Sequence, residues 1–340
     1  MTAVIFDKVS IVFGDHPERA LPLMDQGLTR SQIQEQTGQI LGVHDCSLTV
    51  GEGEILVLMG LSGSGKSTLL RGVNALNPVV RGEVRVLDGD QMVSVTKAAP
   101  DRLRHLRLNK IAMVFQQFGL LPWRSVRDNV GLGLELAGQT ADQRRAAVDA
   151  QLALVNLSQW ADRKVGELSG GMQQRVGLAR AFVTNAPILL MDEPFSALDP
   201  LIRARLQDEL LDLQATLKRT IIFVSHDLDE AFKLGDRIAL MEGGRIVQIG
   251  TAREIIANPV SDYVADFVAH MNPMAVLTAR DVMEPGSSAG PSIDAELPVK
   301  QVMAMLSAGA VELSVTAEGA AIGVVRAAGL MSRLINPRQG

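Results

Sequence analysis

The pattern of hydrophobic residues predicts a series of strands along the chain. Residues 4–13 alternate between apolar and polar side chains well enough to form a strand, and residues 48–50 and 55–59 predict two more around a turn at 51–53. Longer apolar runs further along are typical of strands buried on both faces. The remaining strands are predicted at 82–89, 111–115, 188–192 and 220–225, with a hairpin over 237–249 that turns at Gly243 and Gly244.

Helical spacing of apolar residues and helix-start signals occupy the stretches between these strands. A polar stretch at about 15–42 is helix-prone: Pro17 can open one helix, the capping-box residues Thr29 to Gln32 can open a second, and Gly38 can close it. This alternation of strands and helices is typical of the α/β class. The other helices are predicted at 101–110, within 120–165, after Gly171, at 200–217, at 253–257 and at 261–269.

The composition changes near the C-terminus. A flexible stretch rich in Gly, Ser and Pro at 284–292 lies inside a tail with few aromatic residues. The tail contains a helical pattern at 299–306, short strands at 311–315 and 321–325, and a last helix at 329–335. We therefore predict a main domain over residues 1–272 and a small α/β domain over residues 273–340.

Composition and charge limit the classes of partner. With 340 residues, a net charge of −5 and a pI of about 5.6, the chain has no overall positive field that would favour nucleic acid. Its single cysteine, Cys46, excludes an intramolecular disulfide and is typical of a reducing compartment. The first residues lack signal-peptide features, and no stretch approaches the roughly 18 apolar residues of a membrane span. We expect a cytosolic protein whose membrane-spanning partners, if any, are other chains.

The most specific motif follows the strand at 55–59. It has the pattern GxxxxGK[ST], in which glycines let backbone N–H groups point inward at a polyphosphate while the next helix adds its positive N-terminus. Lys66 can reach the β- and γ-phosphates, and the Ser67 hydroxyl can bind Mg²⁺. ATP or GTP binding is therefore predicted for this loop, which comprises Gly60, Leu61, Ser62, Gly63, Ser64, Gly65, Lys66, Ser67 and Thr68.

Two adjacent carboxylates form a second nucleotide motif. Asp192 and Glu193 stand at the tip of the strand at 188–192, where two acids are costly unless cations or proton transfer employ them. Asp192 can hold Mg²⁺, and Glu193 can orient or deprotonate the attacking water. His226 directly follows the strand at 220–225, and a catalytic and a structural role are about equally favoured for it.

Four further features are weak on their own. Phe13 lies near the end of the first strand, where it can stack on a base or serve as an ordinary sheet residue. Gln116 follows the strand at 111–115. The Ser-Gly-Gly sequence at 169–171 opens a helix and offers an anion site, although such sequences are more often plain helix entries. Asp199 caps the helix that begins at the next residue.

Together these motifs have the order and approximate spacing of ATP-binding-cassette (ABC) ATPases, and about residues 1–270 resemble that family. The resemblance implies a P-loop NTPase core with an antiparallel β subdomain and a helical signature subdomain. It implies ATP and Mg²⁺ as cofactors, with Phe13 stacked on the base and His226 against the γ-phosphate. It also implies a homodimer in which each signature caps the nucleotide bound to the other subunit; the signature residues are Ser169, Gly170 and Gly171.

Further residue roles follow from the same resemblance. Lys66, Glu193 and His226 are the expected catalytic residues, and the expected metal ligands are Ser67, Gln116 and Asp192. Asp199 belongs to the expected nucleotide site. Gln116 is also expected to contact a transmembrane partner, and the segment 118–130 with Trp123 is a candidate for the same contact, about as favoured as ordinary packing within the helical subdomain.

A closer resemblance rests on Phe13-Gly14, the insert at about 15–42, and residues 111–116 and 225–230. These resemble ATPase subunits of glycine betaine, proline betaine and choline importers. The resemblance implies uptake of quaternary-amine osmoprotectants through integral-membrane permease subunits, at the cytoplasmic face of the inner membrane, with a substrate-binding protein acting indirectly. The tail resembles a single degenerate regulatory module of the cystathionine-β-synthase (CBS) type.

Three alternatives stay open. An importer of another small solute is one, since substrate is selected elsewhere in such systems. A soluble cassette ATPase acting on nucleic acid is disfavoured by the acidic pI and by one cassette rather than two. A nucleotide-sensing module with vestigial hydrolysis is disfavoured by the intact Lys66, Asp192, Glu193 and His226.

Overall fold

The computed structural model describes residues 1–269 and 276–335, which fall into two compact units. The first unit comprises residues 1–226 and 239–246, and the second comprises the described parts of 227–238 and 247–340. The predicted boundary between residues 272 and 273 lies outside the described residues, so the division into those two domains stays a prediction. Among the described helices, none has both the length and the apolar character needed to cross a bilayer.

A six-stranded sheet of order β10-β9-β3-β8-β7-β6 positions the predicted motifs. Strands β3, β8, β7 and β6 are parallel, and every residue of the first three is buried. The carboxyl ends of parallel strands share one edge of a sheet, so the segments that follow these strands meet there. The strands are β3 (Ile55–Met59), β6 (Ile111–Val114), β7 (Ile188–Asp192), β8 (Thr220–Val224), β9 (Arg237–Glu242) and β10 (Arg245–Gly250).

A second, antiparallel sheet has the order β2-β1-β4-β5. The strand predicted at 48–50 is much longer, because main-chain pairing with β1 begins at Phe13 opposite Ile40 and takes in the last residues of the predicted insert. The short polar strand β5 was not predicted, since it has little hydrophobic pattern and is held by pairing with β4. The strands are β1 (Thr2–Phe13), β2 (Ile40–Gly51), β4 (Arg81–Asp88) and β5 (Gln91–Ser94).

The insert between β1 and β2 forms a short 3₁₀ turn, η1 (Pro17–Ala20), and two helices, α1 (Leu21–Asp25) and α2 (Arg30–Thr37). The predicted capping box is present: the Thr29 side chain accepts a hydrogen bond from the backbone N–H of Gln32, and the Gln32 side chain accepts one from the backbone N–H of Thr29. Gly38 ends the helix with a φ of 70°. The insert has its own hydrophobic cluster on β1 and β2, so it is a packed structure; the cluster contains Val12, Ala20, Met24, Ile33 and Leu41.

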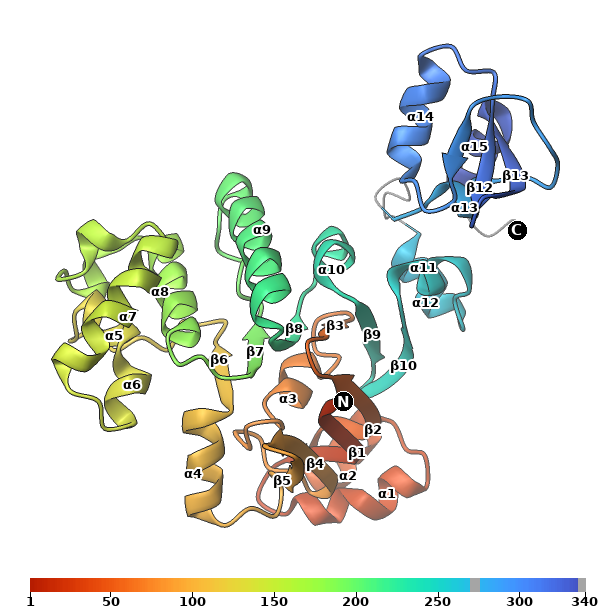
Figure 1. Cartoon of the computed structure of the whole chain (residues 1–340). Coiled ribbons are helices and arrows are strands. Elements are labelled where there is room, and N and C mark those ends of the chain that lie inside the picture. The colour runs from red at the N-terminus through yellow and green to blue at the C-terminus, as the bar shows by residue number, and fades with distance from the viewer. Residues whose placement is uncertain (270–275, 336–340) are drawn as a thin grey trace. The chain divides into compact units, whose positions relative to one another are not determined.

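Four helices of the first unit gather away from its sheets, drawn yellow to green in Figure 1. They share a core that includes Val126, Val148, Leu152 and Val176. They are α5 (Val126–Val130), α6 (Leu132–Leu136), α7 (Ala141–Leu154) and α8 (Gly170–Phe182). The unit also contains α3 (Lys66–Leu70), α4 (Pro100–Asn109) and α9 (Pro200–Leu217), together with the 3₁₀ turns η2 (Ser158–Trp160) and η3 (Val165–Glu167).

The second unit contains a three-stranded sheet of order β11-β12-β13 with its own core, which includes Val299, Leu313 and Val325. The CBS-like assignment of these residues stays a prediction. The shortest elements, α13 and β11, were not predicted because three or four residues carry no periodic signal. The elements are α10 (Leu228–Leu234), α11 (Ala252–Ala257), α12 (Asp262–Val268), α13 (Ala279–Val282), β11 (Ser292–Asp294), α14 (Val299–Ser307), β12 (Glu312–Ala317), β13 (Ala320–Arg326) and α15 (Ala327–Ile335).

Candidate nucleotide-binding site

The loop between β3 and α3 has the backbone shape that its glycines predict. Gly60 has a φ of 139°, and a Cβ there would lie 2.1 Å from the carbonyl oxygen of Met241, so a side chain does not fit. The buried Lys66 donates from Nζ to the carbonyl oxygens of Gly60 and Leu61, at 2.8 and 3.0 Å. Burial lowers the pKa of Lys66, while the nearby charges of Glu193 and Asp192 act in the opposite direction.

The buried Asp192 lies beneath this loop. Its Oδ1 accepts a hydrogen bond from Ser67 Oγ at 2.6 Å, and its Oδ2 pairs with the Arg71 guanidinium at 2.9 Å. These two partners satisfy a carboxylate that has no exposure to solvent. The adjacent hydroxyl and carboxylate oxygens are also the hard donors that Mg²⁺ prefers, so this pair fits the predicted metal role.

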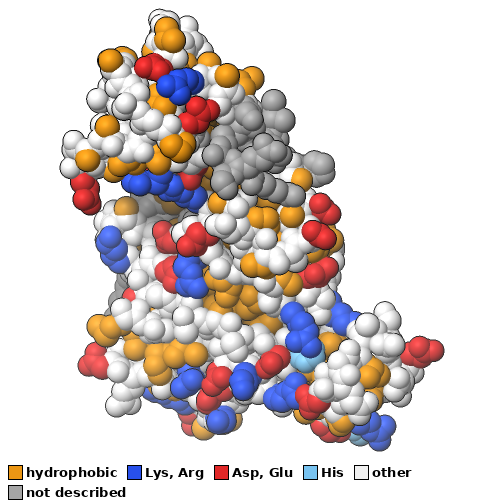
Figure 2. Space-filling model, turned by 90° about the vertical axis from the view of Figure 1, so that its right-hand side faces the viewer, with side chains coloured by type: hydrophobic (Ala, Val, Ile, Leu, Met, Phe, Trp, Pro, Cys, Tyr) orange, Lys and Arg blue, Asp and Glu red, His pale blue; other side chains and the backbone are white. Residues whose placement is uncertain are grey.

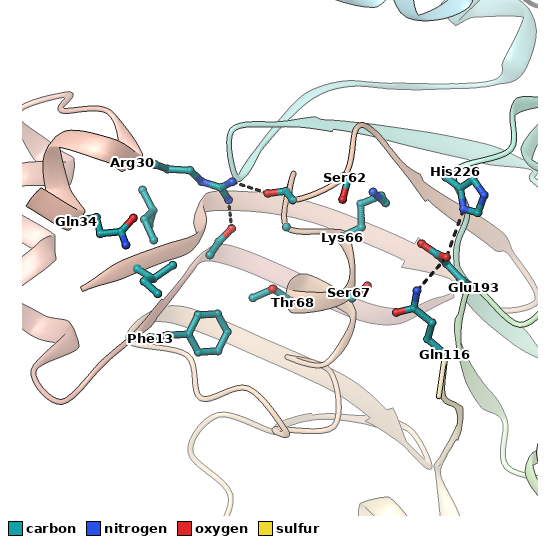
Figure 3. Close-up of a pocket in the computed structure, with 15 residues that line it drawn as sticks. Phe13, Arg30, Gln34, Ser62, Lys66, Ser67, Thr68, Gln116, Glu193 and His226 are labelled. Carbon is teal, nitrogen blue, oxygen red and sulfur yellow. Dashed lines mark hydrogen bonds and ion pairs between the residues drawn. The ribbon is translucent and has the colours of Figure 1, made fainter. Parts of the chain in front are cut away.

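Glu193 meets Gln116 and His226 at the edge of the parallel sheet (Figure 3). Its Oε2 accepts from Gln116 Nε2 at 3.1 Å and lies 3.4 Å from His226 Nδ1. The backbone of Glu193 is left-handed, with a φ of 48°, and is held by an N–H bond to Val224 and by the Ser196 hydroxyl on its carbonyl. Unusual backbone conformations of this kind cluster at functional sites.

A cleft of about 710 Å³ joins these groups to Phe13. Phe13 is 36% exposed and faces the cleft from the end of β1. Its ring fits because residue 42 is glycine: a Cβ at Gly42 would lie 2.8 Å from the Phe13 ring and 2.9 Å from the methyl group of Thr68. The predicted residues that line the cleft are Phe13, Ser62, Gly63, Gly65, Lys66, Ser67, Thr68, Gln116, Glu193 and His226.

Sequence reasoning missed one wall of this cleft. The wall comes from the insert and the start of β2, and comprises Arg30, Gln34, Ile40, Leu41 and Gly42. The capping box indicated that Arg30 begins a helix, but nothing in the sequence indicated that the helix faces the loop between β3 and α3.

The predicted signature lies elsewhere, at the exposed start of α8. Ser169 caps this helix through its hydroxyl, and Gly170 and Gly171 form its first turn. Asp199 likewise caps α9, accepting from the N–H of Ile202 at 3.0 Å. None of these four residues is among the described residues that line the cleft of this chain.

Known proteins are similar in sequence to the part of the chain that contains this site. The family described as ABC transporter matches residues 43–196. The glycine betaine/proline betaine transport system ATP-binding protein ProV of Escherichia coli is 53% identical over 80% of this chain and 67% of its own length. The glycine betaine transport ATP-binding protein OpuAA of Bacillus subtilis is 48% identical over 82% of this chain and 66% of its own length. The trimethylamine N-oxide transport system ATP-binding protein TmoW of Ruegeria pomeroyi is 44% identical over 87% of this chain and 86% of its own length.

Solved structures share the fold. A dimeric ATP-binding cassette, MJ0796, in a post-hydrolysis state with ADP and Pi, superposes with a TM-score of 0.62 at 29% identity. That match covers 73% of this chain and 98% of the cassette. Its bound ADP and Pi are products of ATP hydrolysis.

Proposed function

The chain belongs to the ABC transporter ATP-binding family and is an ABC-type ATPase, and on that premise we propose that it powers import of quaternary-amine osmoprotectants such as glycine betaine. The observation that carries the ATPase role is the meeting of Lys66, Glu193 and His226 around one cleft. The substrate class is proposed from the relatives' names, which specify glycine betaine for ProV and OpuAA.

The residues of the cleft support distinct roles in hydrolysis. Lys66 and the loop N–H groups bind the β- and γ-phosphates and stabilise charge that develops on the transferred group. Glu193 orients and deprotonates the attacking water, and its carboxylate is held by Gln116 and His226 before the reaction. His226 is 64% exposed, which leaves its ring free to contact the γ-phosphate.

The donor set also fits Mg²⁺. Ser67, Asp192 and Gln116 would hold the ion, with the first two already in contact at 2.6 Å. Bound there, Mg²⁺ would supply positive charge against the phosphates. The protein's own contribution is to fix the Ser67 hydroxyl against Asp192 and to pair Asp192 with Arg71.

We propose that two copies of the chain act together. The signature residues Ser169 to Gly171 are exposed or half-exposed at a helix N-terminus and do not line the described cleft of their own chain. A helix N-terminus carries a positive partial charge suited to the γ-phosphate of a second copy. The solved cassette relative is dimeric. Each copy would thus complete the site of the other.

Partner membrane subunits are proposed, like the substrate, from the names of the relatives. The relatives are ATP-binding proteins of transport systems, and ATP hydrolysis in this chain has to be coupled to separate permease subunits at the inner face of the membrane. Trp123 is 69% exposed, and a tryptophan this exposed favours a contact with another chain over packing inside the helical group. A substrate-binding protein would act on the permease rather than on this chain.

The nucleic-acid alternative has little support. On the face drawn in Figure 2, basic and acidic side chains are interspersed and do not form one large basic area. A protein that neutralises several phosphates needs clustered Lys and Arg residues.

The test is transport with a hydrolysis-deficient subunit. Cells whose own copy is replaced by Glu193→Gln should lose uptake of labelled glycine betaine, because removal of a general base typically slows turnover roughly 10²- to 10⁴-fold. Glu318→Gln, at an exposed turn between β12 and β13, is the matched control and should leave uptake unchanged. Labelled choline and trimethylamine N-oxide are measured in parallel.

The uptake measurements identify the transported substrate, and the ATPase measurement tests the role of Glu193. Loss of glycine betaine or choline uptake supports the proposed quaternary-amine class, and loss of trimethylamine N-oxide uptake alone reassigns the substrate. If Glu193→Gln retains near wild-type ATP hydrolysis in the purified protein, the role of Glu193 is wrong.

A further inference from the structure

Two side chains of the insert face the nucleotide cleft. Arg30 is the first residue of α2 and Gln34 lies one turn later, so they share a helix face. Both line the cleft opposite the Glu193 end, as Figure 3 shows. The buried Ile33 between them packs into the insert's own hydrophobic cluster, which fixes this face toward the cleft.

Arg30 contacts the phosphate-binding loop directly. Its Nη1 donates to the carbonyl oxygen of Gly63 at 2.6 Å, and its Nη2 donates to the carbonyl oxygen of Gly42. A guanidinium has five N–H donors, so several remain after these bonds. The Nε of Arg30 is buried and has no hydrogen-bond partner in the part of the chain that the structure describes. The side-chain amide of Gln34, which is exposed, also has none within the described residues.

The geometry of the cleft indicates which part of a nucleotide these donors meet. The loop that binds phosphates lies in the middle, Glu193 and His226 lie on one side, and Phe13, Arg30 and Gln34 lie on the other (Figure 3). A γ-phosphate near Glu193 places the nucleoside on the opposite side. An aromatic ring, a cation and an amide there provide a stacking surface and hydrogen bonds for a base and a ribose.

We propose that α2 forms part of the nucleotide site and that Arg30 and Gln34 bind the base and ribose of ATP. This inference rests on the proposed function, since it requires phosphates at Lys66. It gives the insert a role in nucleotide affinity.

The experiment compares two ligands of the purified full-length chain by calorimetry. ADP contains the nucleoside, and inorganic tripolyphosphate does not. Arg30→Gln should weaken ADP binding about 10- to 100-fold, as expected for a lost charge-assisted hydrogen bond, and Gln34→Leu roughly 2- to 10-fold. Both should change tripolyphosphate binding less than about 2-fold. Arg19→Gln and Gln36→Leu, exposed residues of the same insert that do not line the cleft, are the controls.

Each outcome has one meaning. Equal weakening of both ligands by Arg30→Gln means that Arg30 acts through the loop, and an unchanged ADP affinity in both variants means that the insert only packs; either overturns the proposal. Gln34 has no partner to lose in the described structure, so Gln34→Leu tests the proposal without a folding defect, and thermal unfolding checks both variants. Failure of the proposed function is recognised separately, because Lys66→Ala would then leave the affinity for ADP and tripolyphosphate unchanged.

Discussion

Replacing Gly42 with alanine should weaken nucleotide binding by displacing the Phe13 ring. The added methyl group would lie 2.8 Å from the Phe13 Cε2 and 2.9 Å from the Thr68 Cγ2, and 3.2 Å from the carbonyl oxygen of Ile11. Contacts this short force a shift. Phe13 is at a strand end and is 36% exposed, so its ring moves more easily than the backbone or a residue of α3.

The size of the effect follows from what the ring contributes. Stacking of a base on an aromatic side chain is worth roughly 1–3 kcal/mol when measured by alanine substitution. At about 1.4 kcal/mol per tenfold change, complete displacement corresponds to a loss of about 5- to 140-fold in ADP affinity. Phe13→Ala should fall in the same range, because it removes the same stacking surface.

A double-mutant cycle measured by calorimetry tests this reasoning. Gly42→Ala should weaken ADP binding in the wild-type background but add almost nothing once Phe13 is already alanine. Gly166→Ala, at an exposed site with no atom within 4 Å of the new Cβ, is the control. Equal losses in both backgrounds would show that Gly42→Ala acts without Phe13, through the phosphate-binding loop or the start of α3.

Three further outcomes are expected. Thr29→Ala removes the cap of α2 and should lower the free energy of unfolding by about 1 kcal/mol, measured by urea denaturation with Ser31→Ala as the control. Gly170→Arg fits the free chain, because nothing lies within 4 Å of its Cβ, but should block the dimer: ADP affinity is kept, whereas hydrolysis falls about 10²-fold or more and ATP-dependent dimers disappear from size-exclusion profiles. Burial raises the pKa of the Cys46 thiol from 9.0 to about 11, which lowers its thiolate fraction at pH 8. Alkylation of the native protein at pH 8 should therefore be at least ~100-fold slower than in urea, and similar rates would contradict that burial.

The meeting of Lys66, Glu193 and His226 around one cleft could be predicted because these residues lie in one contiguous motif or stand at strand ends. The loop around Lys66 is one contiguous motif, and Glu193 and His226 each follow a continuous apolar run that is easily identified as a buried strand. The parallel order of those strands then brings the separate residues together. The strand β5 and the early start of β2 were missed because pairing with other strands, rather than local pattern, holds them.

The wall of the cleft that the insert forms depends on contacts that a single sequence does not encode locally. The insert has polar, helix-prone residues, and its polar side chains suggest a solvent-exposed addition. Only the pairing of Phe13 with Ile40 and the packing of Ile33 bring Arg30 against Gly63, more than thirty residues away. On the proposal above, an insert that contacts the loop around Lys66 in this way adjusts nucleotide affinity without altering the residues of that loop. Changes in the insert should therefore affect how tightly nucleotide binds before they affect how fast it is hydrolysed.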